Sequence, residues 1–151
     1  MKVVTYPVRT TRIRPMVLTI IQRNDEILVF KGQNLVNGEP RYRPLGGGID
    51  FGEKSHEAVA REMMEEISVE VENIEFLDVI ESLFHSQDGT PRHHIIFLYR
   101  AVFTDKSNYD IEEFEIIEDY FTERVVAEWK PIESFKNGDA ILHPKSILKW
   151  I

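Results

Sequence analysis

One strong helix between two groups of apolar strands constrains the fold of this chain more than any other feature. The segment Ser55 to Ile67 is rich in helix-forming residues, and Ser55 can serve as its N-cap. Apolar runs that we expect to form strands flank the helix on both sides. They are Met16 to Gln22, Ile27 to Phe30, Val69 to Val71, Ile74 to Leu83, His94 to Phe103 and Val125 to Trp129. Because this order lacks the regular alternation of a doubly wound fold, it predicts a mixed α/β or α+β sandwich.

Shorter patterns predict the connections between these elements. Turn-forming residues indicate hairpin turns at Arg23 to Glu26 and at Gln87-Asp88-Gly89, and the polar residues 31–41 predict a loop. Residues 104–123 are acidic and weakly patterned. The segment Pro144 to Ile151 has apolar residues at helical spacing and predicts a closing helix.

Composition restricts the classes of protein to which the chain can belong. Its 151 residues favour a single domain over residues 1–151, because two halves would each struggle to bury a core. With 26 acidic and 18 basic residues, the net charge of −8 disfavours duplex nucleic acid and suits divalent cations. The absence of cysteine excludes disulfides, zinc–thiolate sites and thiol nucleophiles. The apolar stretches are too short to span a membrane and the N-terminus lacks a signal-peptide core, so we expect a cytoplasmic protein.

Three acids lie on one stripe of the expected helix. With about 100° of rotation per residue, Glu65 and Glu66 fall on either side of Glu62, opposite an apolar arc. That arc, which we expect to face the core, comprises Val59, Ala60, Met63, Met64 and Ile67. The stripe is interpreted either as a solvated acidic face or as a site for a hard cation such as Mg²⁺, which prefers oxygen ligands. Arg61 beside the acids and the run Gly46-Gly47-Gly48 upstream favour a metal-bound phosphate ligand.

Together these residues resemble the Nudix box, the signature of hydrolases that cleave a nucleoside diphosphate linked to another moiety. The family pattern has G, five residues, E, seven residues and then R-E-U-x-E-E-x-G-U, in which U is a bulky aliphatic residue. The matching residues are Gly47, Glu53, Arg61, Glu62, Met63, Glu65, Glu66 and Val69. The chain departs from the pattern at Ser68, where the family usually has a glycine that ends the helix. That glycine often has left-handed geometry, which costs another residue about 1–2 kcal/mol.

The resemblance implies an α/β/α sandwich around a mixed sheet, in which residues 47–69 form a loop, the helix and a second loop. It also implies Mg²⁺ as cofactor, with Mn²⁺ as a substitute, to neutralise the diphosphate and acidify a bound water. The metal ligands that it implies are Glu62, Glu65, Glu66 and the backbone carbonyl of Gly47. Arg61 would position a carboxylate, and Glu53 would support it or act as an outer ligand.

Family members often add an acid from a loop that precedes a tryptophan. Glu123, six residues before Trp129, is therefore the first candidate for an extra metal ligand or base. The competing acids are equally explained by a solvated acidic loop. They are Glu112, Glu113, Glu115 and Glu118.

Substrate contacts are expected near the glycine run. Arg43 is a candidate for a phosphate contact, although an ordinary surface arginine fits the same pattern, and Gly46, Gly47 and Gly48 allow backbone to approach a ligand. The four bases within residues 1–14 are explained by a solvated arm or by phosphate contact. Several rings have alternative roles in packing and in contacting substrate. They are Tyr42, Phe51, Phe84 and whichever of His93 and His94 faces inward.

The resemblance to the Nudix family implies a Mg²⁺-dependent enzyme that hydrolyses the diphosphate linkage of a nucleoside diphosphate derivative. Features of several subfamilies are missing, which leans the expected substrate towards nucleoside triphosphates. The expected partner is a small nucleotide, with no membrane and no duplex nucleic acid, and a homodimer through the N-terminal strand is left open. The alternative is a catalytically silent Nudix-fold module that binds nucleotide or regulates. Degenerate boxes are expected in such modules, whereas every acidic position of the box is present here.

Overall fold

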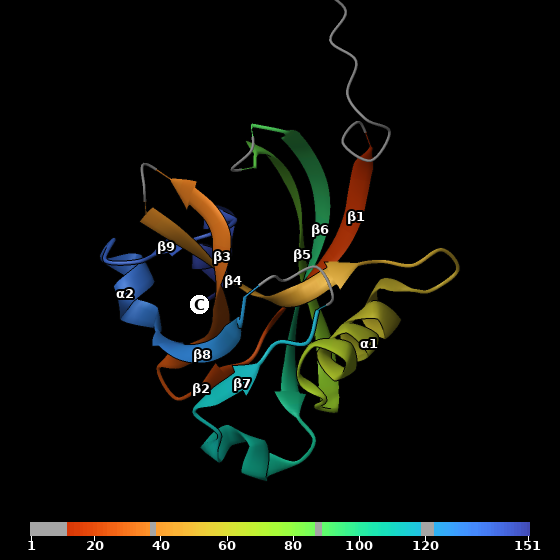
Figure 1. Cartoon of the computed structure of the whole chain (residues 1–151). Helices are drawn as coiled ribbons and strands as arrows, with labels where there is room; N and C mark the ends of the chain where they lie inside the picture. The colour runs from red at the N-terminus through yellow and green to blue at the C-terminus, as the bar shows by residue number, and fades with distance from the viewer. Residues whose placement is uncertain (1–11, 37–38, 87–88, 119–122) are drawn as a thin grey trace, which may run out of the picture.

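Figure 1 shows the computed structural model of the chain, which describes residues 12–36, 39–86, 89–118 and 123–151. Within these residues, one mixed sheet has the strand order β5-β6-β1-β4-β3-β8-β7, with β2 paired to β3 and β9 to β4. The strands are β1 (Ile13–Ile20), β2 (Gln22–Arg23), β3 (Glu26–Val36), β4 (Glu39–Gly48), β5 (Val71–His85), β6 (Pro91–Phe103), β7 (Glu113–Glu115), β8 (Val126–Pro131) and β9 (Ile141–Leu142). The helices are α1 (Ser55–Ile67) and α2 (Ile132–Lys136), and the 3₁₀ helices are η1 (Lys106–Asp110) and η2 (Lys145–Trp150).

Both faces of the sheet are covered, as the alternation of apolar residues in β1 requires. Val17 packs in the core that includes α1, whereas its neighbours Met16 and Leu18 pack in the core that includes α2 and η2. β1 pairs in parallel with β6 and antiparallel with β4, so the sheet is mixed. The α/β/α sandwich that the resemblance implied is confirmed.

Strand β4 changes partner along its length, and this change positions the candidate site. Its residues from Leu45 to Gly48 pair with β1, whereas its earlier residues pair with β3. Helix α1 follows after a short loop and packs against β4 (Figure 1). The glycine run at the end of β4 therefore lies beside the helix that carries the predicted acids.

Helix α1 has the bounds that the sequence predicts, but its N-cap is Lys54 rather than Ser55. The backbone N–H of Lys54 donates to the carboxylate of Glu57 at 2.8 Å, which satisfies one of the groups left over at a helix start. The hydroxyl of Ser55 instead forms a hydrogen bond with the hydroxyl of Tyr99 in β6. The first turn is thereby fixed to the sheet.

The C-terminus of α1 has the geometry that the family usually gives to glycine. Ser68 has a φ of 57° and a ψ of 37°, which lie in the left-handed region. Its N–H donates to the carbonyl of Met64 at 3.0 Å, and this bond closes the last turn of the helix. The departure of Ser68 from the family pattern thus leaves the turn intact and places a side chain where left-handed backbone is unfavourable.

The polar stretch 31–41 does not form the predicted loop. β3 continues to Val36 and β4 begins at Glu39, and the two strands are paired where Leu35 lies opposite Pro40. Backbone groups pair with one another whatever the polarity of the side chains, so polar composition was a poor guide here. The predicted turn residues Gln87 and Asp88 lie outside the described residues.

The C-terminal segment also differs from its prediction. Residues Lys145–Trp150 form the 3₁₀ helix η2 instead of an α-helix. The sequence did not predict α2, β7 or β9, since each is too short to establish a periodic pattern. Among the described residues, no helix has both the length and the apolar character that crossing a membrane requires.

Candidate active site

Two of the predicted acids lie on the buried face of α1. The exposed fraction of Glu62 is 6% and that of Glu66 is 2%, whereas Met64 is 49% exposed. The prediction that Ala60 and Met64 face the core is therefore wrong, because the helix is rotated so that two carboxylates point inward. The buried face consists of Ala58, Val59, Glu62, Met63, Glu66 and Ile67. The side chain of Glu65, in contrast, is 55% exposed.

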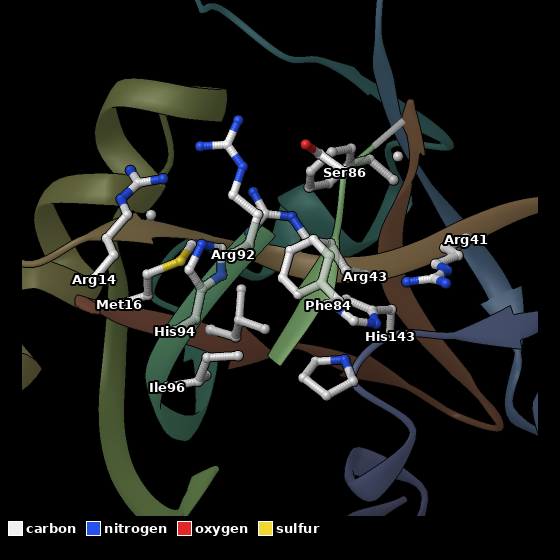
Figure 2. A pocket seen from close by; sticks show the side chains of 15 residues that line it. Arg14, Met16, Arg41, Arg43, Phe84, Ser86, Arg92, His94, Ile96 and His143 are labelled. Carbon is white, nitrogen blue, oxygen red and sulfur yellow. The ribbon is translucent and has the colours of Figure 1, made fainter. Parts of the chain in front are cut away.

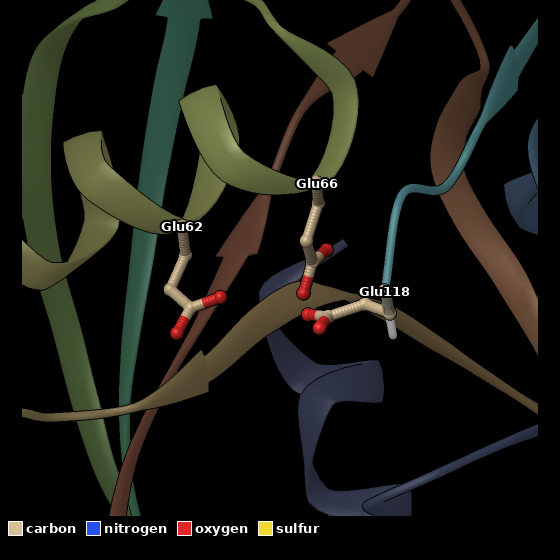
Figure 3. A group of neighbouring side chains, drawn as sticks. All are labelled: Glu62, Glu66 and Glu118. Atoms are coloured by element: carbon tan, nitrogen blue, oxygen red, sulfur yellow. The ribbon is translucent and has the colours of Figure 1, made fainter. Parts of the chain in front are cut away.

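Glu118 meets these two acids from a different part of the chain. Glu62, Glu66 and Glu118 each offer a carboxylate oxygen, and these oxygens all lie within 4.8 Å of one another. Figure 3 shows the three side chains converging from α1 and from the segment that follows β7. The backbone N–H of Ile117 donates to the carbonyl of Glu66 at 2.9 Å, so this segment is attached to the end of the helix. We call these three side chains the acidic cluster.

Burial makes negative charge on the acidic cluster unfavourable in the absence of a cation. It raises the pKa of Glu66 to about 8; the positive charge of Arg43 opposes this change, and the charges of Glu62 and Glu118 add to it. Burial also raises the pKa of Glu62, against the hydrogen bond from Arg61. Among the described residues, Glu66 Oε2 is buried without a hydrogen-bond partner. Buried carboxylate oxygens in this arrangement are suitable ligands for a hard divalent cation.

The guanidinium of Arg61 connects the acids around it. Its Nη2 donates to Glu53 Oε1 at 2.6 Å, and its Nε donates to Glu53 Oε2 at 3.0 Å. Its Nη1 donates to Glu62 Oε1 at 3.1 Å and to Glu65 Oε2 at 3.0 Å. Nη2 also donates to the carbonyl of Gly48 at 2.8 Å. One side chain thus joins the end of β4 to three carboxylates, and its hydrogen bonds lower the pKa of Glu53.

Glycine at positions 46 and 47 lets the backbone of β4 approach the acidic cluster. A side-chain carbon at Gly47 would overlap the carboxylate of Glu62. Gly46 has a φ of 149°, and a side-chain carbon there would overlap the backbone of β1. The backbone of Gly46 also donates a hydrogen bond to the carboxylate of Glu66. The close approach of this strand to the acids therefore requires glycine.

A cavity of about 370 Å³ begins at Gly47, which it shares with the acidic cluster. Figure 2 shows the side chains around this space, which include several nitrogen-bearing groups. They are Arg14, Arg41, Arg43, Arg92, His94 and His143. None of the described residues that line it is an aspartate or a glutamate. We call this space the arginine cavity.

The arginine cavity is built from alternate positions of neighbouring strands. β1 contributes residues 14, 16 and 18, β4 contributes 41 and 43, and β6 contributes 92, 94 and 96, whereas residue 84 comes from the end of β5 and residue 86 follows that strand. Side chains two residues apart in a strand point to the same face, so each strand presents its own set to the cavity. The strand register then places Arg14 opposite His94 and Phe84 opposite Arg92.

Sequence reasoning found only part of this cavity. Arg43, His94 and Phe84 were among the predicted candidates, and all three line it. Arg41 and Arg92 were missed, although each lies two positions before one of those candidates on the same strand. That spacing was a usable signal. His143 comes from a segment with no strand pattern, and nothing in the sequence indicates its position.

Several other predicted residues lie away from the acidic cluster. Glu123 is exposed and is not one of the three acids that converge, so its role as a metal ligand or base stays a prediction. Phe51 is fully exposed, and Tyr42 packs edge-on against Phe135. His93 lies 3.8 Å from Glu81. The other competing acids form ion pairs elsewhere: Glu112 with Arg23, and Glu113 and Glu115 with Arg124.

Comparison with known proteins places the chain in a family. The NUDIX domain family model matches residues 11–151. Over 66 residues, or 44% of this chain, the sequence is 33% identical to the NAD-capped RNA hydrolase NudC of Pseudomonas syringae pv. tomato. Over the same length it is 38% identical to the protein of that name in Pseudomonas fluorescens. The matched segment spans 23% of the length of each of these curated relatives.

Solved structures share the fold over most of the chain. The MutT NUDIX hydrolase of Burkholderia pseudomallei has a TM-score of 0.59 and 22% identity, with 81% of this chain and 85% of that chain covered. The mutator MutT protein of Bacillus halodurans has a TM-score of 0.60 and 19% identity, with 91% and 80% covered. Identities this low show likeness of fold alone. Because the family model matches almost the whole sequence, this chain belongs to the NUDIX domain family.

Proposed function

We propose that this chain is a pyrophosphohydrolase that cleaves the diphosphate linkage of nucleoside diphosphate derivatives. The observation that carries this proposal is the convergence of Glu62, Glu66 and Glu118, two of them buried, because ionised carboxylates this close repel one another and a cation between them relieves that repulsion. Family membership supports the type of reaction. The curated relatives are named for hydrolysis of NAD-capped RNA, which supports a nucleotide-linked diphosphate as the class of substrate.

The donor set of the acidic cluster fits a divalent cation, for which we propose Mg²⁺, with Mn²⁺ as a substitute. Glu62, Glu66 and Glu118 would hold it, and the unpartnered Glu66 Oε2 supports this assignment. When bound, such an ion neutralises phosphate oxygens and acidifies a water molecule. Three further predicted ligands remain part of the proposal. They are Glu65, Glu123 and the backbone carbonyl of Gly47.

Two arginines have separate roles in the proposed reaction. Arg61 holds the carboxylate of Glu62 in place and is itself fixed by Glu53, so it acts as a positioning residue. Arg43 lines the arginine cavity, and its positive charge is close enough to Glu66 to lower the pKa of that carboxyl. The guanidinium of Arg43 is therefore near both the arginine cavity and the acidic cluster. We propose that Arg43 binds a phosphate oxygen of the substrate. The backbone of Gly46, Gly47 and Gly48, which borders Glu62 and Arg14 without side chains of its own, remains part of this proposed substrate contact.

The test of this function is a hydrolysis screen with a matched pair of variants. Nucleoside triphosphates, dinucleotides, nucleotide sugars and NAD-capped RNA are incubated with Mg²⁺, and the nucleotide products are separated by chromatography. We expect turnover of at least one substrate, and we expect Glu66→Gln to reduce it by a factor on the order of 100 or more. Glu70→Gln is the control, because Glu70 is an exposed acid three residues beyond the helix.

The outcomes of the screen separate enzyme from binding module. Full activity of Glu66→Gln would show that the acidic cluster does not serve the reaction. If no substrate is turned over, but Mg²⁺ and a nucleotide each raise the melting temperature, the chain is the catalytically silent module instead. We further propose that residues 1–151 act as one domain in the cytoplasm on a small nucleotide derivative. A homodimer through the N-terminal strand stays a prediction, and residues 1–11 lie outside the described residues.

A further inference from the structure

The arginine cavity holds positive charge that its surroundings do not neutralise. Among the described residues, no carboxylate oxygen lies within 4.0 Å, the limit for an ion pair, of a guanidinium nitrogen of Arg14, Arg41 or Arg92. The Nε of Arg41 is buried and has no hydrogen-bond partner within the same part of the chain. Such arginines are unusual in a molecule whose net charge is −8, because carboxylates are plentiful elsewhere on it.

The two histidines of the cavity do not supply the missing negative charge. Burial lowers the pKa of His94 and of His143 to about 4, and the charges of nearby arginines lower it as well. Both rings are therefore uncharged at neutral pH, and each offers one hydrogen-bond donor and one acceptor. Phe84 packs edge-on against both, with ring centroids 5.2 Å and 4.8 Å apart, so the two rings are held in place.

This combination of charge and shape selects an anion rich in oxygen. Guanidinium groups present planar pairs of donors that match phosphate oxygens, and arginines gathered around one space repel one another until an anion lies between them. A neutral sugar or nucleobase would leave that repulsion unrelieved. The cavity, at about 370 Å³, is large enough for a phosphate group with part of what it is attached to.

We propose that Arg14, Arg41 and Arg92 bind a third phosphate group of the substrate, in addition to the two phosphates of the linkage that is cleaved. This inference rests on the proposed hydrolysis. Gly47 lines the arginine cavity and touches Glu62, so a group bound there lies next to the acidic cluster. The three arginines are specificity residues: they favour substrates with a third phosphate over nucleoside diphosphate sugars, whose second half is neutral.

The binding part of this proposal is tested without metal and without turnover. Inorganic tripolyphosphate is titrated into the full chain in EDTA by calorimetry, with adenosine as the uncharged probe. We expect tripolyphosphate to bind, and we expect Arg92→Gln and Arg14→Gln each to weaken it roughly ten-fold or more. The matched control is Arg124→Gln, because Arg124 is an exposed arginine that pairs with Glu115 outside the cavity. Equal affinity in all four proteins, or binding of adenosine alone, would overturn the proposal.

The selectivity part compares two substrates that share adenosine. We expect Arg92→Gln to lower kcat/KM for adenosine triphosphate roughly ten-fold or more and to change kcat/KM for adenosine diphosphate glucose far less. Arg92→Lys, which keeps the charge without the planar fork, should recover part of the loss. Equal losses for both substrates would refute a role in selectivity. If tripolyphosphate binds through these arginines but no substrate is hydrolysed, the cavity assignment stands and the proposed hydrolysis fails.

Discussion

Arg61 and Glu53, eight residues apart, are joined by N–O contacts of 2.6, 3.0 and 3.2 Å, and this pair anchors the side chain that holds Glu62. The remaining nitrogen of the guanidinium, Nη1, donates to Glu62 and Glu65 of α1, so one rigid group orients all of these carboxylates. A planar group with five donors can satisfy this set, whereas an ammonium at the end of a flexible chain cannot.

Arg61→Lys should therefore impair activity more than it impairs folding. We expect kcat to fall roughly ten-fold or more because Glu62 loses its orientation, and stability to fall by about 1 kcal/mol because the contacts are partly exposed. Kinetics and thermal melting measure the two effects. Arg23→Lys is the control, because Arg23 has similar contacts with Glu26 and Glu112 but lies outside the acidic cluster. The melting temperature of this variant should drop without a change in kcat. Equal kcat in the Arg61→Lys variant and the parent would contradict this role.

Gly47→Ala should disrupt the acidic cluster directly. The added methyl group would occupy the space of the Glu62 carboxylate, so we expect turnover to fall by a factor on the order of 100 or more. Gly48→Ala provides the comparison. Its methyl group would lie 3.1 Å from the flexible end of Arg14, which can move aside at a cost in substrate binding, so kcat at saturating substrate should fall much less. Steady-state rates under saturating Mg²⁺ measure both effects. A larger loss of turnover in Gly48→Ala than in Gly47→Ala would refute the assignment of the acidic cluster to the reaction.

Ser68→Gly should stabilise the protein. Its left-handed backbone disfavours a side chain by about 1–2 kcal/mol, and the added freedom of glycine in the unfolded chain offsets about 0.4–1 kcal/mol of that gain. We expect a net increase on the order of 0.5–1 kcal/mol, or about 1–4 °C in melting temperature for a chain of this size. Ser68→Ala retains the side-chain carbon and should show no such gain. A fall in melting temperature for Ser68→Gly would mean that the serine hydroxyl matters more than the backbone strain.

Removal of divalent cations should destabilise the parent protein selectively. The acidic cluster then loses its counter-charge, so we expect EDTA to lower the melting temperature by several degrees and millimolar Mn²⁺ to restore it. In Glu66→Gln this difference should largely vanish, whereas Glu70→Gln should behave like the parent. Scanning calorimetry with and without Mn²⁺ provides the measurement. An unchanged Mn²⁺ response in Glu66→Gln would place the ion elsewhere.

Acid should destabilise the fold through His94 and His143. Burial lowers the pKa of each to about 4, so between pH 6.5 and 4 the unfolded chain binds protons that the folded chain does not. Stability from these groups is thus present above pH 6.5 and is lost as the pH falls towards 4. Urea unfolding at several pH values should show a shallower decline for His94→Gln than for the parent. His56→Gln, at an exposed position of α1, should decline as steeply as the parent.

The sequence located the helix and its acids but not the direction in which they point. Hydrophobicity favours Ala60 and Met64 for the core, yet Glu62 and Glu66 are buried in their place. A cluster of acids suited to a cation departs from the usual pattern of apolar burial, and periodicity alone does not reveal such a departure. The Nudix pattern did single out Glu62 and Glu66, which both lie in the acidic cluster, because it fixes their spacing regardless of their burial.

Long-range relationships were less accessible than local ones. Glu118 is separated from Glu66 by three strands and a 3₁₀ helix, and no local pattern links it to α1. The hairpin of β3 and β4 was likewise hidden, since its pairing depends on the backbone and not on the polar residues between 31 and 41. The arginine cavity was partly predictable. The sequence shows the alternate spacing of its residues within each strand, but it does not show which strands lie side by side in the sheet.

The uneven placement of charge on this chain also affects how ligands arrive. With four guanidinium groups facing one opening and a net charge of −8 overall, most of the remaining surface repels a diffusing polyanion. Productive collisions are thereby concentrated at the opening of the arginine cavity, and the capture rate becomes sensitive to ionic strength. The range of this guidance shrinks from roughly 30 Å at 0.01 M salt to about 10 Å at 0.1 M.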